Sequence, residues 1–325
     1  MKVLFATDGS RYALEAARFL ARRLCSRSEV EIDVLAVFQS DEGAPSTSEK
    51  PPPAGEAQEV RPTTARAEAQ RWVTDARGAL EGPGRKVGAK VLGGPPEEVV
   101  VGESQGYDLV VLGVKGRGAS PFFELGRVAR ATLQRSLASV LLVRPPSEEG
   151  GEKAEDRFRV LLSAEEEDPG LHASWDMLHP FSSSDTEVEI VTVMPEASHG
   201  MALAARTTPG REPRHRVRER ANRWLNRTLT SLPASGRPVR PLLLEGRPAS
   251  ELGYRAVESG ADLLVMGGGR ARTRDPRPSS PLGATARELA WSSPCSVLLV
   301  RGRELRPPVE RPLSRRTGAR TTQEV

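Results

Sequence analysis

The chain has 325 residues, of which 47 are basic and 43 acidic, and its formal net charge at pH 7 is +4. This length accommodates two domains of ordinary size, each large enough to bury its own core. The near balance of charge gives only weak evidence for a nucleic-acid partner, and we expect none. Two cysteines, Cys25 and Cys295, provide no disulfide framework and are typical of a reducing compartment.

No apolar segment approaches the length needed to span a membrane, and the apolar run at the N-terminus is interrupted by Asp8. We therefore expect a cytoplasmic protein with no membrane partner. Residues 303–325 are rich in arginine and interrupted by prolines, so we expect a disordered basic tail. The segment 40–62 is rich in proline, glycine and charged residues and is predicted to be a mobile insertion.

Short apolar runs alternate with helical patterns in the first half of the chain. The predicted strands are 3–6, 31–38, 86–92, 109–112 and 140–143. Helices are predicted after Ser10, over 64–80, after Pro95 and from about Arg127. Strands that alternate with helices predict parallel pairing with right-handed crossovers.

The second half repeats this order after a polar linker at 147–156. Its predicted strands are 159–162, 187–193, 239–244, 263–266 and 297–300, with a helix over about 216–229. The segment 107–113, Tyr-Asp-Leu-Val-Val-Leu-Gly, returns 154 residues later as Ala-Asp-Leu-Leu-Val-Met-Gly, and the segment 138–144 returns 157 residues later. A period of this length indicates a domain duplication, with domains at 1–146 and 157–302.

A glycine-bearing loop follows the fourth strand of the first half, with Gly113 and Gly116 before Gly126 at the start of a helix. Glycines allow backbone N–H groups to approach an anion closely, and a helix N-terminus favours phosphate. Ligands of open parallel sheets collect beyond the carboxyl ends of the strands, where Asp8 also lies. The alternative is that Asp8 only caps the first helix and that the glycines only make a turn.

These features together resemble the universal stress protein family over 1–146 and 157–302. The marks are Asp8, the Gly-Pro-Pro-Glu segment 94–97, the strand 108–113, the glycine spacing and the closing segment 139–144. The resemblance implies two tandem Rossmann-like α/β domains. Each would be a five-stranded parallel sheet of order 3-2-1-4-5 with helices on both faces. Some members of the family bind ATP and others do not.

The resemblance also implies a set of nucleotide-binding residues in the first half. Asp8 and the backbone of Val37 would face the adenosine, and Gly113 and Gly116 would lie along the ribose and phosphates. Gly126, Arg127 and Val128 would present N–H groups to the terminal phosphates. Arg127 departs from the family's ATP binders, which have Ser or Thr there, and it either clamps phosphate or points into solvent.

The second half keeps the pattern of strands but loses the motif. Glu165 stands where Asp8 would be, Arg270 replaces the second glycine, and Ala284 replaces the hydroxyl residue. The neighbouring carboxylates at 165–168 would repel a polyphosphate. We therefore expect no nucleotide in the second half.

The last predicted strand of each half, Val140–Val143 and Val297–Val300, is wholly apolar and is expected at a sheet edge. Pairing one with the other would satisfy both edges, so we expect an intramolecular pseudo-dimer. The leading hypothesis is a stress-related regulator, not an enzyme, that binds ATP or a similar adenine nucleotide, with or without magnesium, in its first half. The alternatives are a ligand-free scaffold for unknown protein partners and, third, a slow ATP hydrolase. No histidine spacing suggests a metal site.

Overall fold

The structure is a computed structural model that describes residues 1–24, 29–39, 64–117, 125–145, 157–165, 170–194, 213–232, 238–268 and 282–301. The predicted insertion at 40–62, the linker at 147–156 and the tail at 303–325 lie outside the described residues.

The described residues of the first half form five strands and four helices in alternation. The strands are β1 (Lys2–Thr7), β2 (Val30–Phe38), β3 (Arg85–Gly93), β4 (Leu109–Gly113) and β5 (Ser139–Val143). The helices are α1 (Arg11–Arg23), α2 (Thr64–Leu80), α3 (Pro96–Ser104) and α4 (Arg127–Arg135). Each expected element is present, with bounds that differ by a residue or so from those expected.

The second half follows the same plan. Its strands are β6 (Phe158–Ser163), β7 (Thr186–Met194), β8 (Val239–Glu245), β9 (Leu263–Gly267) and β10 (Ser296–Val300). Its helices are α5 (Gly170–Leu178), η2 (His179–Phe181), α7 (Arg214–Ser231), α8 (Pro248–Ser259) and α9 (Ala284–Ser292). Of these helices, only α7 had been given a predicted range. Helix α5 occupies the place of α1 and buries Leu171 and Trp175 against the sheet.

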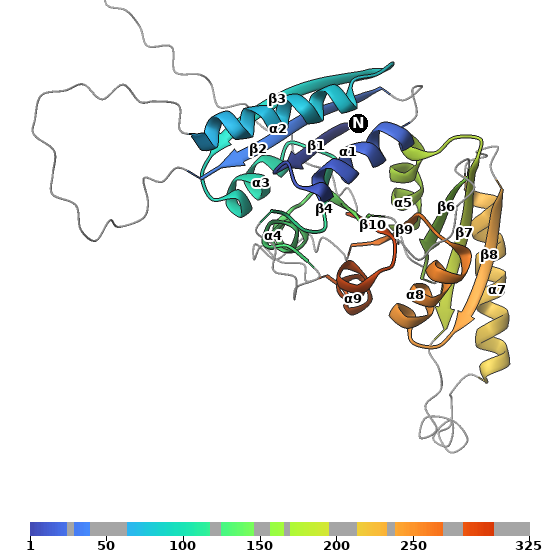
Figure 1. Ribbon diagram of the computed structural model, residues 1–325. Coiled ribbons are helices and arrows are strands. Elements are labelled where there is room, and N and C mark those ends of the chain that lie inside the picture. Colours follow the sequence, from blue (N-terminus) through green and yellow to red (C-terminus); the bar gives the residue numbers. More distant parts are fainter. Residues whose placement is uncertain are drawn as a thin grey trace, which may run out of the picture.

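The ten strands form one continuous sheet in the order β3-β2-β1-β4-β5-β10-β9-β6-β7-β8 (Figure 1). Each half has the expected order 3-2-1-4-5, and its strands are parallel. The two halves meet where β5 and β10 pair antiparallel, with Leu142 opposite Val297 and Leu141 opposite Leu298. The last strand of each half is therefore an interior strand of the combined sheet.

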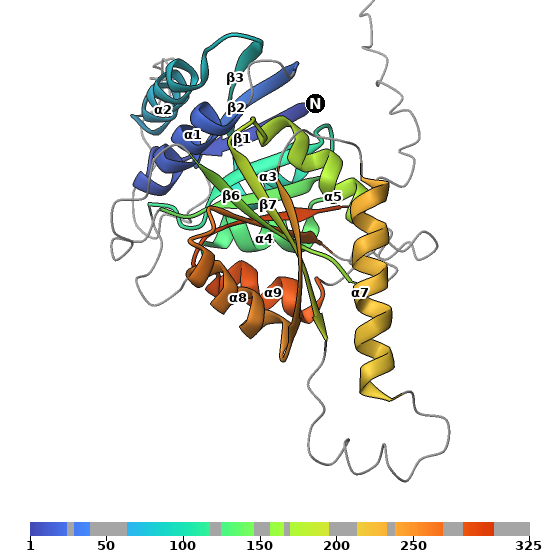
Figure 2. The ribbon, with the colours of Figure 1, turned by 90° about the vertical axis from the view of Figure 1, so that its right-hand side faces the viewer.

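Helices cover both faces of this sheet (Figure 2). One core lies between the sheet and α1, α2, α5 and α7, and the other lies between the sheet and α3, α4, α8 and α9. The first core crosses the boundary between the halves, because the ring of Phe19 on α1 lies edge-on to that of Phe158 on β6, with centroids 6.0 Å apart. The arrangement is an α/β fold of two Rossmann-like units.

Candidate functional site

The turn after β1 shows what Asp8 does locally. Ser10 is the N-cap of α1, and its Oγ accepts a hydrogen bond from the N–H of Ala13 at 3.2 Å. Asp8 instead accepts the N–H of Ser10 at Oδ1, 3.0 Å away, while Gly9 between them has φ +67°. The conformation of Gly9 is one that other residues rarely adopt. Asp8 therefore does not cap the helix, and its second oxygen faces away from this turn.

That second oxygen joins Asp8 to the glycine loop after β4. Asp8 Oδ2 accepts the backbone N–H of Arg117 at 2.7 Å, which links residues 109 positions apart. A Cβ on Gly116 would lie 2.5 Å from the same oxygen, so only glycine allows the carboxylate this close. From the strand order, Asp8 and the glycine loop were expected to lie on either side of a ligand, and the direct hydrogen bond between them was not expected.

Arg117 and Trp72 are site residues that sequence reasoning missed. The Arg117 guanidinium lies 4.6 Å from the centroid of the Trp72 ring and 3.5 Å from the carboxylate of Glu68, both on α2. The Trp72 ring also covers the turn, since a Cβ on Gly9 would lie 2.4 Å from its Cδ1. No signal in the sequence pointed here, because α2 and the loop are brought together only by the fold.

The other expected residues lie at the same end of the sheet. Thr7 pairs with Ala36, so the following residues, Asp8 and Val37, both lie at the carboxyl ends of neighbouring strands. Gly113 ends β4 and packs against α1, where an added Cβ would lie 2.7 Å from the backbone of Tyr12. This close packing is a structural reason for Gly113 that holds with or without a ligand.

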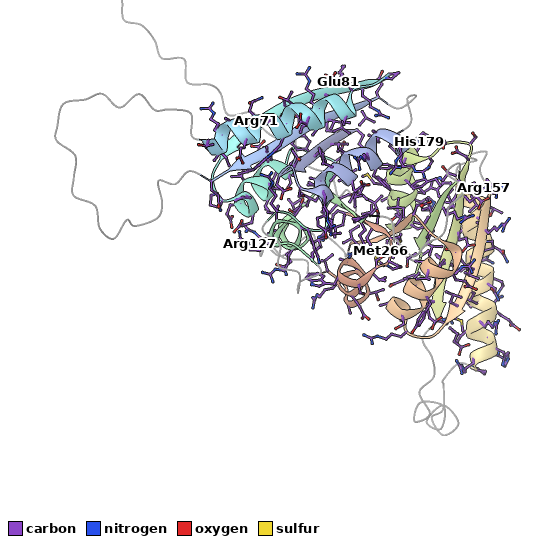
Figure 3. All side chains as sticks on the ribbon, in the orientation of Figure 1. Arg71, Glu81, Arg127, Arg157, His179 and Met266 are labelled. Carbon is purple, nitrogen blue, oxygen red and sulfur yellow. The ribbon has the colours of Figure 1, made fainter. Side chains whose placement is uncertain are left out.

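The N-terminus of α4 holds the last of the expected site residues. Gly126 is its N-cap and donates its N–H to the carbonyl of Val114 at 2.8 Å, which ties the helix to the glycine loop. No side chain among the described residues caps this end, so the first N–H groups of α4 remain available to an acceptor. The side chain of Arg127 is exposed (Figure 3). That of Val128 is half-buried. The side chain of Arg127 points into solvent.

The corresponding place in the second half differs. Glu165 follows β6, and Gly283 is the N-cap of α9. Gly268 follows β9 and donates its N–H to the carbonyl of Val300. The carbonyl of Gly268 accepts a hydrogen bond from the Arg301 guanidinium at 2.7 Å. Arg270 and residues 166–169 lie outside the described residues.

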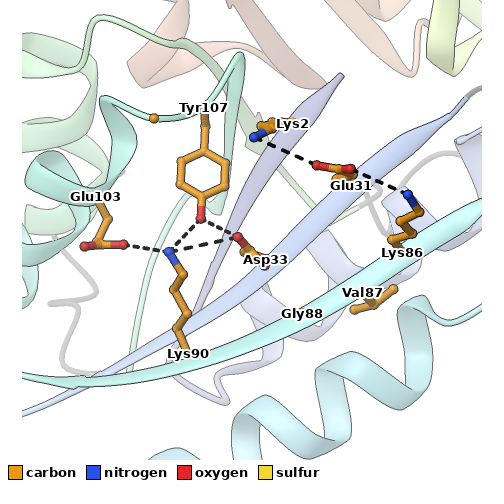
Figure 4. Close-up of a pocket in the computed structure, with 10 residues that line it drawn as sticks. Lys2, Glu31, Asp33, Lys86, Val87, Gly88, Lys90, Glu103 and Tyr107 are labelled. Carbon is orange, nitrogen blue, oxygen red and sulfur yellow. Dashed lines mark hydrogen bonds and ion pairs between the residues drawn. The ribbon is translucent and has the colours of Figure 1, made fainter. Parts of the chain in front are cut away.

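A hollow of about 500 Å³ lies at the opposite, amino ends of β1, β2 and β3 (Figure 4). Lys90 donates to Glu103 and to the Tyr107 hydroxyl at 3.0 Å each, and Tyr107 donates to Asp33 at 2.6 Å. The bond with Tyr107 raises the pKa of Lys90, and burial raises the pKa of Tyr107. These groups satisfy one another, so we interpret the network as structural.

Another hollow, of about 640 Å³, lies between the two halves. Arg11, Tyr12 and Lys115 line it from the first half, and Trp291 and Pro294 line it from the second. Among the residues that the structure describes, no group of three or more His, Cys, Asp and Glu side chains could hold a metal ion. Within the same part of the chain, no helix has the length and apolarity required to cross a membrane.

Comparison with known proteins agrees with this architecture. The model of the universal stress protein family matches residues 1–144 and 179–301. A universal stress protein from Archaeoglobus fulgidus DSM 4304 has 18% identity and a TM-score of 0.55, with 92% of this chain and 98% of that one covered. A functionally unknown protein from Pseudomonas aeruginosa PAO1 has 13% identity and a TM-score of 0.54, with 92% of each chain covered. No curated protein matches the chain.

The fold and the site define a tandem α/β protein with a glycine loop at the carboxyl ends of its first parallel sheet. The family match covers well over half of the chain and falls in both halves. The chain belongs to the universal stress protein family. A universal stress protein solved in complex with cAMP is also similar, with 18% identity, a TM-score of 0.33, and 44% of this chain and 97% of that one covered.

Proposed function

We propose that this protein is a stress-related regulator that binds ATP or a similar adenine nucleotide in its first half. The observation that carries the proposal is the meeting of Asp8 with Gly116 and Arg117 at the carboxyl ends of β1 and β4. The sheet order reverses at this point, because β1 lies between β2 and β4. Ligands of open α/β sheets bind at such a position.

The charge at the start of α4 supports an anionic ligand. The first turn of α4 contains no acidic residue and begins with Arg127, whereas the first turn of α3 contains Glu97 and Glu98. A cation at a helix N-terminus is unfavourable unless an anion offsets it, since the helix dipole is positive there. Phosphate groups would accept the free N–H groups and offset Arg127 together. The start of α4 therefore suits a nucleotide phosphate, and Mg²⁺ would bind only as the counter-ion of that phosphate.

Isothermal titration of the full chain with ATP tests this proposal, with and without Mg²⁺. We expect saturable binding, and we expect Asp8→Asn to weaken it about tenfold or more because a charge-assisted hydrogen bond is lost. Asp75→Asn on the exposed face of α2 is the matched control and should bind like the wild type. A protein that takes up no adenine nucleotide at millimolar concentration is incompatible with the proposal.

A ligand-free scaffold is the second candidate, and the position of Arg117 favours it. Both oxygens of Asp8 already accept hydrogen bonds, and the Arg117 guanidinium occupies the space over Trp72. If Arg117 closes the crevice against a ligand, Arg117→Ala should increase the affinity for ATP. If the protein is a scaffold, neither the wild type nor Arg117→Ala should bind ATP.

We propose no enzymatic step, because no residue of the described site can be assigned as a general base or metal ligand beside the phosphates. Slow ATP hydrolysis is the third candidate, and phosphate release that disappears in Gly116→Ala would support it. The domain boundaries at 146 and 157, the cytoplasmic location and the absence of nucleotide from the second half stay predictions.

A further inference from the structure

Four arginines form a stripe on the outer face of α7. Arg216, Arg220, Arg223 and Arg227 are spaced by four, three and four residues, which places them on one side of a helix. All four are exposed. The buried residues of α7 are Ala221, Leu225 and Thr228, on the opposite side. Figure 2 shows α7 in yellow along one flank of the molecule. We call these four residues the α7 arginine stripe.

The duplicated fold supplies an internal comparison. Helix α2 holds the same place in the first half, between the second and third strands. It contains three arginines and two acidic residues, a net charge of +1, whereas α7 contains six arginines and one glutamate, a net charge of +5. Since both helices cover the same kind of sheet face, packing alone does not explain the charge of α7. The overall charge of +4 conceals this local concentration.

Three cations of the stripe, Arg216, Arg223 and Arg227, are available to a ligand. Within the described part of the chain, Arg216 and Arg227 form no side-chain hydrogen bond or ion pair, and Arg223 bonds only to the carbonyl of Glu219 in its own helix, at 3.4 Å. Glu219 is the one acidic residue of α7. Elsewhere arginines of this protein do pair with carboxylates, as Arg255 does with Glu189 at 2.6 Å.

We propose that the α7 arginine stripe binds the phosphate backbone of double-stranded nucleic acid. The stripe runs from Arg216 to Arg227, a rise of eleven steps or about 16 Å of helix. Along the same length a duplex presents about five phosphates on each strand, one every ~3.4 Å. Exposed, evenly spaced guanidinium groups suit such a row of phosphates, and contacts of this kind position a protein without reading sequence.

The geometry favours a duplex over the other polyanions. A helix that binds a membrane surface inserts an apolar face between the lipids. The apolar face of α7 is already packed on β7 and β8, with Leu225 buried in the core. An acidic peptide lacks the rigid, regular charge spacing that would match a straight row of arginines. Membranes and acidic peptides are therefore the competing outcomes of the test.

Fluorescence anisotropy with a labelled 20-base-pair duplex of mixed sequence tests the proposal on the full chain without nucleotide. The test variant is Arg216→Gln, Arg223→Gln and Arg227→Gln together. The matched control is Arg66→Gln, Arg71→Gln and Arg77→Gln on α2, which removes the same charge from exposed positions. Residues 303–325 are kept in every variant, so their own contribution to binding is constant.

We expect the test variant to bind about tenfold more weakly or worse at low salt, and the slope of log affinity against log salt to fall by about two to three. The control should bind within about threefold of the wild type. The corresponding triple lysine variant of the stripe should retain most of the affinity, because lysine keeps the charge. Circular dichroism confirms that each variant is folded.

Three results would overturn the proposal. The first is no binding of the duplex by the wild type at about 100 μM protein in low salt. The second is an equal loss in the test and control variants. The third is tighter binding of phosphatidylserine vesicles or polyglutamate than of the duplex. None of these results depends on whether the first half binds ATP.

Discussion

Arg144 and Arg301 make reciprocal hydrogen bonds across the boundary between the two halves. The N–H of Arg144 donates to Ser296 Oγ at 3.2 Å, and the N–H of Arg301 donates to Ser139 Oγ at 3.1 Å. The guanidinium of Arg144 donates to the carbonyls of Ala290 and Trp291, near the end of α9. The guanidinium of Arg301 donates to the carbonyl of Leu133, near the end of α4. Each arginine thus satisfies carbonyls that end a helix of the other half.

Arg301→Ala should lower the free energy of unfolding by about 1 to 3 kcal/mol, because hydrogen bonds to a charged group are lost and a partly buried carbonyl is left without its donor. Urea denaturation measures this. Arg157→Ala is the control, since Arg157 forms an exposed ion pair with Glu187 and its loss should change stability by less than about 1 kcal/mol. Equal effects of the two substitutions would show that the hydrogen bond to Leu133 adds no more to the free energy of unfolding than an exposed ion pair does.

Pairing of β5 with β10 should make Leu141 critical for stability. Leu141 is fully buried and lies opposite Leu298. Leu141→Ala should cost about 2 to 5 kcal/mol of unfolding free energy through the cavity that it leaves. Leu137→Ala, at a leucine that is 71% exposed, should be nearly neutral. Thermal and urea unfolding of both variants measure the difference, and a neutral Leu141→Ala would contradict the packing described for this boundary.

Gly116→Ala should separate the Asp8 carboxylate from the glycine loop, because the new Cβ would lie 2.5 Å from Asp8 Oδ2. We expect weaker ATP binding, by about tenfold or more, together with a loss of stability of about 1 to 3 kcal/mol. Gly102→Ala within α3 is the control. Nothing lies within 4 Å of its would-be Cβ, so it should be stabilising by about 0.5 to 1 kcal/mol. Unchanged ATP affinity in Gly116→Ala would argue against a role for the loop.

Stability should fall at alkaline pH through Lys90 and Tyr107. The pKa of each is raised in the folded protein, that of Lys90 first by its bond with Tyr107 and that of Tyr107 first by burial. Because each pKa is higher in the folded protein, each group contributes its full stabilisation below its pKa in the unfolded chain, about 10 for both. This stabilisation is lost as the pH rises from there through the pKa in the folded protein. Urea unfolding between pH 8 and 11 should show this loss.

Tyr107→Phe tests the same network by removing the hydroxyl that joins Lys90 to Asp33. It should lower stability by about 1 kcal/mol at neutral pH and make the alkaline decline shallower. Tyr254→Phe, at a tyrosine that is 72% exposed, should keep the alkaline decline of the wild type. A decline of the same steepness in all three proteins would rule out the network as its cause.

Much of the fold could be predicted from the sequence, because its signals are local. Each signal depends only on residues close together in the chain. The signals are apolar runs of strand length, prolines in the first turn of α3 and α8, and the repeated closing segments. Asp8 and the glycines were expected at the same end of the sheet, on either side of a ligand, from the strand order and the family resemblance. Helix α5 was missed because its short sequence lacks a clear start signal, although its position behind β6 follows from the repeat.

The sequence by itself therefore determined the duplication and the alternation of strands and helices, and the family resemblance added the order of the strands. The tertiary structure alone decided that Arg117 lies over Trp72 and that the arginines of α7 face solvent. It also decided that Arg144 and Arg301 each donate hydrogen bonds to a helix of the other half. The physical reason is the range of the interactions. Propensity and periodicity act within a few residues of the chain, whereas these contacts join segments that only the packed sheet brings within hydrogen-bonding distance or leaves uncovered.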